Sequence, residues 1–327
     1  MELGARLRAF AAFVRRRSFG GAADELRISQ PAVSQHIADI ERDLGVQLIE
    51  RRSRELTIAG ELLASHVLRA EALLAQGMHC VRALQAPETG TLSVLASGTP
   101  GTYLLPEVIT RFQRAHPGVR IGFGLAIAKD VVESIRAHRA EIGVVGGFLT
   151  APEIEAEPLI EDEIVIVGAP SLKRRRLSRD AIEELTWISR EEGSGTGAIA
   201  DASIGGLGII PRRRLALPSW EAIKLAVRHG HGIAACSRLA VADELETGSL
   251  VVLPILPSKI RRTFSIIRTR DAALTPAART FLAMLHEHCA RQAFTDRRDE
   301  TAEPSPHRAR AGRMRGRDHA ARSPRRA

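Results

Sequence analysis

Cysteine is scarce in this chain of 327 residues, which contains only Cys80, Cys236 and Cys289. The three are odd in number, lie far apart in the sequence and form no C-x-x-C pair. A disulfide framework needs paired cysteines and a zinc ribbon needs closely spaced ones, so we expect neither. We interpret the three residues as buried apolar thiols, and we expect no metal and no cofactor.

Hydrophobic runs long enough to cross a bilayer are also missing. The first twenty residues contain a short apolar stretch, but no adequate signal core and no small-residue cleavage site. We therefore expect a cytoplasmic protein with no membrane partner. Its 44% hydrophobic and 26% charged residues are ordinary for a globular protein, and its length allows two or three domains.

The net charge is +9, and most of it lies at the C-terminal end. Residues 297–327 contain ten Arg against four acidic residues, whereas the 296 residues before them contain 37 basic and 34 acidic ones. This end is poor in apolar residues, so we expect residues 293–327 to form a disordered basic tail. Such a tail either adds a salt-sensitive attraction to DNA or has no role, and composition leaves both alternatives open.

The most informative stretch of the chain runs from Ser29 to Ile37. Ser29 is a good N-cap, and Pro31 fits the first turn of a helix, where its missing N–H costs nothing. One face of this helix is apolar, and the opposite face carries amides and hydroxyls. Such groups read base edges in a major groove. This stretch therefore predicts a DNA-recognition helix. Its apolar stripe, at helical spacing, consists of Val33, Ile37, Ile40 and Leu44.

Around this helix, residues 1–60 have the pattern of a small helical domain with a wing. An apolar helical stripe that includes Leu7 and Phe10 is followed by Ser18, which caps a short second helix. A helix-turn-helix is therefore expected at about residues 18–38. We expect residues 48–51 and 55–57 to pair as a short hairpin, which would make a basic wing at about residues 46–57.

A long helix is expected next, from Thr57 to about residue 86, where Pro87 ends it. Its apolar residues alternate in spacings of four and three over about three heptads, a pattern typical of a paired helix. We predict a linker and dimerisation helix at residues 57–88, and packing of the stripe against the same chain is the alternative. The predicted dimerisation residues are Leu63, Val67, Ala70, Leu74, Val81 and Leu84.

After Gly90 the pattern changes to short apolar strands that alternate with helices. Such alternation predicts an α/β domain with parallel strands over residues 90–292. The expected strands lie at 91–96, 119–124, 142–146, 164–168, 233–235, 250–253 and 264–268. The expected helices lie at 106–116, 131–137, 220–228, 238–246 and 275–291.

Many spaced positions in the first sixty residues match one known pattern. They are Ser18, Phe19, Ala22, Ala23, Leu26, Ile28, Ser29, Gln30, Pro31, Ala32, Val33, Ser34, Ile37, Ile40, Glu41, Leu44, Gly45, Leu48, Arg51, Leu56, Thr57 and Gly60. In these positions the segment resembles the LysR-type transcriptional regulators. Later pieces resemble the effector-binding region of the same family: Leu105, Pro106, Phe112, Pro117, residues 190–196 and residues 230–234.

The resemblance implies a multidomain fold. An all-α winged helix-turn-helix and a long linker helix would precede an α/β effector domain with two lobes, like a periplasmic binding protein. Lobe I would comprise about residues 90–165 and 267–292, and lobe II about residues 166–266. The basic tail lies outside the resemblance.

The resemblance also implies which residues touch DNA. Gln30, Pro31, Ser34 and Gln35 would face bases, while Ser29 and the helix N-terminal amides would meet a phosphate. Three wing residues would contact phosphates or enter a narrow minor groove, namely Arg51, Arg52 and Arg54. This wing is about two residues shorter than is usual in the family. A solvated charged face, offset by Glu50 and Glu55, is the alternative for the wing arginines.

An effector would lie in the cleft between the lobes, as expected for a pocket at strand ends between α/β lobes. Hydroxyls and backbone N–H groups that can hold an anion come from lobe I at Ser97, Gly98 and Thr99, and from lobe II at Ser194, Gly195 and Thr196. Two positions depart from the family pattern. Gly197 replaces a frequent Arg, and Ile127 with Ala128 replaces a polar pair. Simple turn chemistry is the alternative for both loops.

An enzyme and a ligand-binding protein without a DNA role are the two alternative classes. A Gly230-x-Gly232-x-x-Ala235 pattern follows a helix and precedes a strand, the reverse of a dinucleotide fingerprint, and other catalytic motifs are missing. We therefore expect no enzyme and no catalytic residues. His286, His288 and Cys289 scatter around one helix, which argues against a metal site. A ligand-binding protein without a DNA role would leave the helix-turn-helix unexplained.

We therefore expect a regulator that acts as a homodimer or homotetramer on double-stranded DNA in the nucleoid. Two-fold symmetry would match promoter half-sites that are related as a palindrome. RNA polymerase is a further expected partner, through the resemblance. An unidentified small molecule would be the effector, and its binding would shift the packing of the domains.

Overall fold

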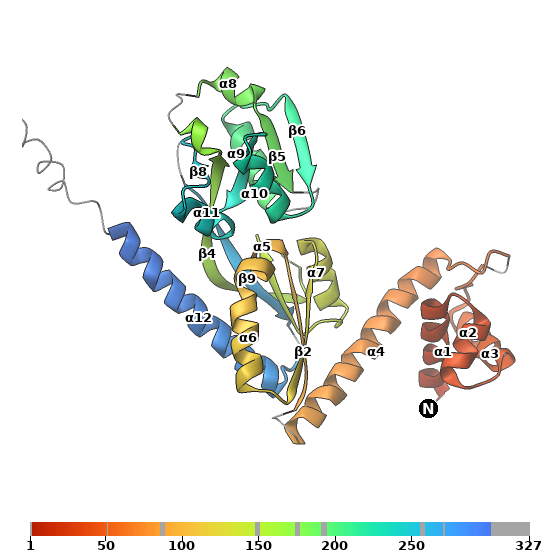
Figure 1. The fold of residues 1–327 in the computed structure, drawn as a ribbon. Helices are drawn as coiled ribbons and strands as arrows, with labels where there is room; N and C mark the ends of the chain where they lie inside the picture. Colours follow the sequence, from red (N-terminus) through yellow and green to blue (C-terminus); the bar gives the residue numbers. More distant parts are fainter. Residues whose placement is uncertain are drawn as a thin grey trace, which may run out of the picture.

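The computed structural model describes residues 2–50, 52–85, 89–147, 151–173, 177–190, 195–255, 259–270 and 272–301. A small helical N-terminal domain is followed by one long helix and then by an α/β domain with two lobes (Figure 1). Among the described residues, no helix is both long and apolar enough to cross a membrane.

The N-terminal domain consists of α1 (Glu2–Arg16), α2 (Phe19–Leu26) and α3 (Gln30–Leu44). Phe10 and Phe13 of α1 are fully buried at its centre, where the apolar stripe of α3 packs. Small residues of α2, Ala22 and Ala23, are buried too and allow a close crossing. The predicted stripe ends one turn early. Leu44 is 53% exposed, because the left-handed residue Gly45 ends the helix there.

Helix α4 (Ile58–Gln85) has two halves with different surroundings. In its first half Val67 is buried and Leu63 is partly buried against the core of the N-terminal domain. At these two positions the stripe packs within its own chain, which corrects the expectation of a pairing seam along its whole length. In the second half three side chains of the predicted stripe are exposed: Leu74 by 68%, Val81 by 61% and Leu84 by 65%.

The α/β domain is built on one mixed sheet in the order β2-β1-β3-β9-β4-β7-β5-β6, with β8 paired to β4. Parallel pairing is confined to the two ends of this order. The strands between them pair antiparallel, so the expected all-parallel sheet is wrong in its centre. The strands are β1 (Gly90–Ala96), β2 (Val119–Leu125), β3 (Ile142–Gly146), β4 (Ile154–Gly168), β5 (Thr186–Arg190), β6 (Arg213–Leu217), β7 (Ile233–Ser237), β8 (Val251–Val252) and β9 (Ile260–Thr269).

Strands β4 and β9 pass through both lobes and pair along most of their length (Figure 1). The expected strand 164–168 is only the last third of β4, and the expected strand 264–268 is part of β9. The first part of β4 was missed because it is charged at alternate positions and contains Pro158, where the register shifts. This long antiparallel pair joins the two lobes.

Helices cover both lobes. In lobe I they are α5 (Gly98–Tyr103), α6 (Leu105–Ala115) and α7 (Ala128–Arg136). In lobe II they are α8 (Arg179–Glu184), α9 (Gly195–Gly206), α10 (Trp220–Arg228) and α11 (Ala242–Glu246), with short 3-10 turns at η1 (Pro170–Leu172) and η2 (Leu239–Val241). Helix α9 was not expected from the sequence, because four of its twelve residues are glycine.

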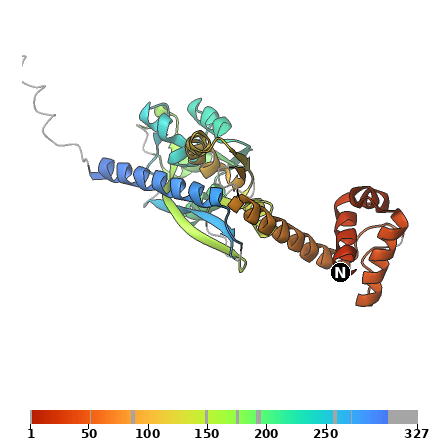
Figure 2. The same cartoon turned by 90° about the horizontal axis from the view of Figure 1, so that it is seen from below.

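The last helix, α12 (Pro276–Thr301), continues ten residues past its expected end at Arg291. No Pro or Gly follows Pro276 until Pro304, so nothing in the sequence breaks the helix earlier. The start of the expected disordered tail is therefore helical, while residues 302–327 lie outside the described residues. Figure 2 shows α12 and α4 leaving the α/β domain in opposite directions.

Candidate functional site

The N-terminal end of α3 is exposed. The hydroxyl of Ser29 accepts a hydrogen bond from the backbone N–H of Ala32 at 3.3 Å, and Pro31 lies in the first turn. Ser29 is thus the N-cap that its sequence position predicts. Five of the residues predicted to touch DNA share this exposed surface: Ser29, Gln30, Pro31, Ser34 and Gln35.

Gln35 is held in place by its neighbours on α3. Its amide nitrogen donates to Asp39 Oδ1 at 2.8 Å, and Arg42 pairs with the same oxygen at 2.7 Å. The hydrogen bond from Gln35, more than the charge of Arg42, holds the pKa of Asp39 below its usual value. This bond uses one N–H of the Gln35 amide, so its other N–H and its oxygen remain available to a base edge.

The wing is a tight turn. Ile49 and Leu56 form a single antiparallel bridge, and the N–H of Glu50 donates to the carbonyl of Glu55 at 2.8 Å. The expected hairpin is therefore reduced to one bridge. Arg52 and Arg54 are exposed at this turn, and Arg54 has a left-handed backbone with φ +59°. Arg51 lies outside the described residues.

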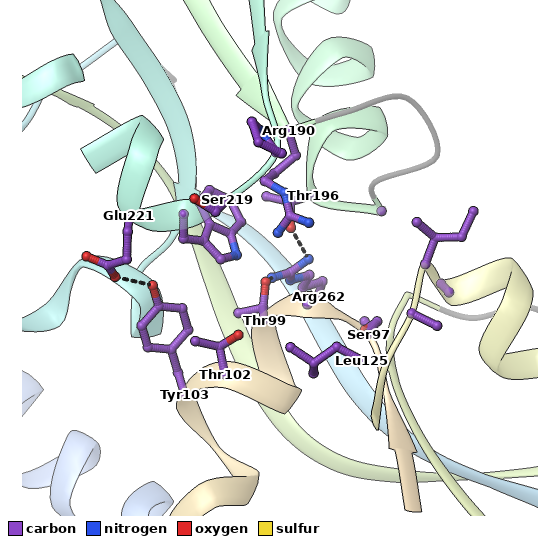
Figure 3. A pocket seen from close by; sticks show the side chains of 18 residues that line it. Ser97, Thr99, Thr102, Tyr103, Leu125, Arg190, Thr196, Ser219, Glu221 and Arg262 are labelled. Carbon is purple, nitrogen blue, oxygen red and sulfur yellow. Dashed lines mark hydrogen bonds between the residues drawn. The ribbon is translucent and has the colours of Figure 1, made fainter. Parts of the chain in front are cut away.

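A cavity of about 400 Å³ lies between the two lobes (Figure 3). Five of the six residues predicted to bind an effector line it, and Ser194 lies outside the described residues. Ile127 and Ala128, the apolar departures from the family pattern, also line it. The five lining residues are Ser97, Gly98, Thr99, Gly195 and Thr196.

The lobe I side of the cavity is the end of β1. Ser97 follows that strand and precedes α5, and its hydroxyl accepts the N–H of Gly146 at 3.1 Å. Gly146 in turn lies against the start of α9 in lobe II. A Cβ on Gly195 would come within 2.8 Å of the carbonyl oxygen of Gly146, so only glycine allows this approach between lobes.

Arg262 connects the two sides of the cavity. It lies on β9 opposite Asp162 on β4, and its Nε donates to Asp162 Oδ2 at 2.8 Å. Its Nη1 donates to the hydroxyl of Thr196 at 2.7 Å and its Nη2 to that of Thr99 at 3.3 Å. Burial lowers the pKa of Arg262, and Asp162 offsets part of this effect. One guanidinium thus contacts both lobes and the strands that join them.

A second set of charges lies at the rim, where Tyr103 of lobe I donates to Glu221 of lobe II at 3.2 Å (Figure 3). Lys224 pairs with Glu221 at 2.8 Å and with Glu244 at 2.9 Å. Although burial lowers the pKa of Lys224, its hydrogen bonds to both glutamates raise it above the ordinary value. Burial raises the pKa of Tyr103 to about 12.

Lobe II contributes an aromatic donor and a further cation. The guanidinium of Arg190 lies 5.6 Å from the ring centre of Trp220. Trp220 is 4% exposed, and its Nε1–H has no hydrogen-bond acceptor among the described residues. The described residues contain no group of three His, Cys, Asp or Glu that could hold a metal ion.

Sequence reasoning missed Arg262, Asp162 and Trp220 as parts of this cavity. One signal was present, since the period of a strand puts Arg262 on the same face as Phe264 and Ile266, both of which are buried. A basic residue on an apolar strand face needs a partner. That partner, Asp162, lies 100 residues earlier in the chain, beyond the reach of local patterns.

Comparison with known proteins agrees with this geometry. The family model described as "LysR substrate binding domain" matches residues 85–290, and "Bacterial regulatory helix-turn-helix protein, lysR family" matches residues 5–61. A relative in Escherichia coli (strain K12), "Uncharacterized HTH-type transcriptional regulator YeiE", is 36% identical over 282 residues. This match covers 84% of the present chain and 94% of the relative.

Solved structures of full-length LysR regulators share the fold. The full-length LysG of Corynebacterium glutamicum, with bound effector Arg, has a TM-score of 0.64 and 18% identity, covering 88% of this chain and 98% of its own. Full-length CbnR complexed with its target DNA has a TM-score of 0.59 and 23% identity, covering 89% and 99%.

These matches cover both the helical domain and the lobes, and the matched relative is a regulator and not an enzyme. The chain therefore belongs to the LysR family of DNA-binding transcriptional regulators, with an effector-binding domain after its helix-turn-helix.

Proposed function

We propose that the N-terminal half of α3 enters the major groove of promoter DNA and reads its sequence. The exposure of the amides and hydroxyls there carries this proposal, because such groups pair with base edges. Gln30, Ser34 and Gln35 would face bases beside Pro31, and Ser29 with the helix N-terminus would meet a phosphate. Arg52 and Arg54 of the wing, with Arg51, would contact the backbone or a narrow minor groove.

The effector is proposed to bind in the cavity between the lobes. Residues of both lobes line this cavity, so a ligand there would contact both at once. Such a ligand favours one lobe arrangement over another only if it binds the two with different affinity. LysG, a structural neighbour, is described with a bound effector, which supports a small molecule as the class of ligand.

Two copies of the chain are proposed to pair through the second half of α4. Leu74, Val81 and Leu84 are exposed there at helical spacing, whereas the first half of the helix packs on its own domain. Pairing would bury these side chains and set the distance between two recognition helices. Binding to the chromosome would place the regulator in the cytoplasm at the nucleoid, where RNA polymerase is the expected further partner.

The test compares binding to DNA from upstream of the chain's own gene with binding to random DNA of equal length. Gln35→Ala should cost about 1–3 kcal/mol of discrimination between the two, because a base contact is lost. Arg52→Ala should weaken binding to both DNAs and lower the salt slope by about 1. Arg52 is preferred to Arg54 for this test, because the left-handed backbone of Arg54 would complicate a substitution.

Gln292→Ala, the same change on α12 and away from both the N-terminal domain and α4, is the matched control and should bind both DNAs as the wild type does. Equal loss of affinity for specific and random DNA in Gln35→Ala would contradict its role in reading bases.

A further inference from the structure

The side chains of Arg262 and Asp162 are only 4% and 3% exposed, yet both are charged groups at the boundary between the lobes. Asp162 also accepts a hydrogen bond from the hydroxyl of Ser237 at 2.7 Å. Its two oxygens are therefore both occupied, one by Arg262 and one by Ser237. The pair is neutral as a unit and fixes the position of the guanidinium.

The two threonines bound by Arg262 have unused protons. Thr99 is 4% exposed and Thr196 is 3% exposed, and each hydroxyl oxygen accepts a bond from the guanidinium. A hydroxyl has one donor besides its acceptor lone pairs. Within the described part of the chain neither hydroxyl donates a hydrogen bond, so each proton is available to a ligand in the cavity that both residues line.

Other groups around the cavity are donors too. The Nε1–H of buried Trp220 has no acceptor among the described residues, and the first turns of α9 and α10 border the cavity through Gly195, Thr196 and Trp220. Helix N-termini attract negative charge. Among the described lining residues the one carboxylate is Glu221, whose Oε1 is bound by both Tyr103 and Lys224. The buried part of the lining is therefore rich in donors, whereas this carboxylate is 74% exposed.

We propose that the effector is a small oxyanion held between the hydroxyls of Thr99 and Thr196, and that Arg262 positions and polarises these hydroxyls. This inference rests on the proposed function, in which the cavity is the effector site. A volume of about 400 Å³ is at the small end for ligand pockets, which favours a compact ligand. A guanidinium that donates to a hydroxyl oxygen strengthens the hydrogen bond that the hydroxyl donates onward.

The same geometry links ligand charge to the lobes. Thr99 belongs to α5 of lobe I and Thr196 to α9 of lobe II. An oxyanion that accepts from both hydroxyls binds best when the two threonines are close, so it stabilises the lobe arrangement in which Arg262 binds both of them. A neutral ligand of the same size lacks the charge that these donors favour.

The experiment uses the full chain and isothermal titration calorimetry at a constant ionic strength set with sodium chloride. The probes are sodium sulfate, sodium phosphate, sodium acetate and sodium malonate, with acetamide as the neutral counterpart of acetate. We expect saturable binding of at least one oxyanion and none of acetamide. The double variant Thr99→Val with Thr196→Val keeps the side-chain shapes and removes both hydroxyls. It should weaken the binding of that anion by about tenfold or more. Thr280→Val, the same change at an exposed position of α12, is the control and should bind like the wild type.

A positioning role for Arg262 is tested by Arg262→Lys, which keeps the charge but cannot donate to both threonines in a fixed fork. Arg262→Lys should weaken anion binding about tenfold in the wild-type background. It should change anion binding little in the double valine variant, which lacks both hydroxyls. An additive loss in the two backgrounds would show that Arg262 acts only on the fold and would overturn its role. Melting temperatures of all variants identify any that fails to fold, and Thr99→Ser with Thr196→Ser should restore binding.

Three results would overturn the oxyanion class: no probe anion binds saturably, acetamide binds as well as acetate, or the double valine variant binds unchanged. The proposed function fails separately, if the wild type does not protect specific DNA at all. A neutral or cationic metabolite that alters DNA protection and requires both threonines would keep the cavity as the effector site and refute the oxyanion.

Discussion

Gly60 is the residue whose replacement the structure predicts to be most damaging to the DNA-binding domain. It lies in the first turn of α4, and its N–H donates to the capping hydroxyl of Thr57 at 3.0 Å. A Cβ at this position would collide with the carbonyl oxygen of Leu48 and lie 3.0 Å from the carbonyl carbon. Gly60→Ala therefore forces α4 away from the segment at Leu48 that leads into the wing.

The displaced backbone cannot move freely. The carbonyl of Leu48 accepts a hydrogen bond from the N–H of Thr57 at 3.0 Å, and the N–H of Leu48 donates to Glu41 at 2.8 Å. The side chain of Leu48 is only 1% exposed. Overpacking of a rigid site costs about 1–3 kcal/mol, and a loosened buried hydrogen bond adds about 1–3 kcal/mol. The gain in helix propensity returns at most about 1 kcal/mol. With each contribution near the middle of its range the net loss is about 3 kcal/mol, so we expect a loss of about 2–4 kcal/mol.

Gly77→Ala is the matched control on the same helix. Nothing lies within 4 Å of a Cβ at Gly77, so only the helix propensity changes and stability should rise by up to about 1 kcal/mol. Trp187 and Trp220 are in lobe II and Tyr103 is in lobe I, so their spectra do not report on the N-terminal domain. Hydrogen exchange of the α1–α3 amides does. Their exchange should accelerate roughly 30- to 1,000-fold in Gly60→Ala. Unchanged or slower exchange in that variant would refute the reasoning.

Two further predictions concern titration. Tyr103 is the single tyrosine, so the ultraviolet absorbance of phenolate in the folded chain should titrate near pH 12, and a transition near pH 10 would contradict its burial beside Glu221. Its raised pKa contributes stability that is present below its ordinary value and lost as the pH rises through the folded value. Glu25 accepts hydrogen bonds from Arg15 and Arg16, which hold its pKa below its usual value. Its contribution to stability is therefore present above that value and lost as the pH falls through the folded pKa. In urea unfolding followed by circular dichroism, the free energy of unfolding of Glu25→Gln should fall less at acid pH than that of the wild type. An equal fall in both proteins would show that Glu25 does not contribute to the acid sensitivity.

Prediction from the sequence succeeded where the signal was local. Ser18 and Ser29 cap the helices that they were expected to cap, and Val33, Ile37 and Ile40 form the buried stripe of α3. Caps and helical periodicity act within four residues, so the chain itself carries them. The loops at Ser97–Thr99 and Gly195–Thr196 were also placed correctly at the cavity, through the family resemblance.

The heptad pattern of α4 predicted which residues share a face of the helix, but not which of them are buried within the chain. Its spacing shows which residues share a face and not what covers that face. The tertiary structure divides the stripe: Val67 is buried by the N-terminal domain, whereas Leu74, Val81 and Leu84 remain exposed. The same limit applies to Leu44. The helical spacing predicted that it is buried, but it is exposed because the helix ends beside it at Gly45.

By itself, then, the sequence determined a helix-turn-helix of the LysR type, a long helix after it and an α/β region that holds a cavity. Only the tertiary structure decided that β4 and β9 pair antiparallel through both lobes and bring Asp162 opposite Arg262. It also decided that one guanidinium reaches Thr99 and Thr196, which are 163 and 66 residues away in the chain. The physical reason is that a buried charge is defined by partners distant in sequence, and only the folded sheet brings them within hydrogen-bonding distance.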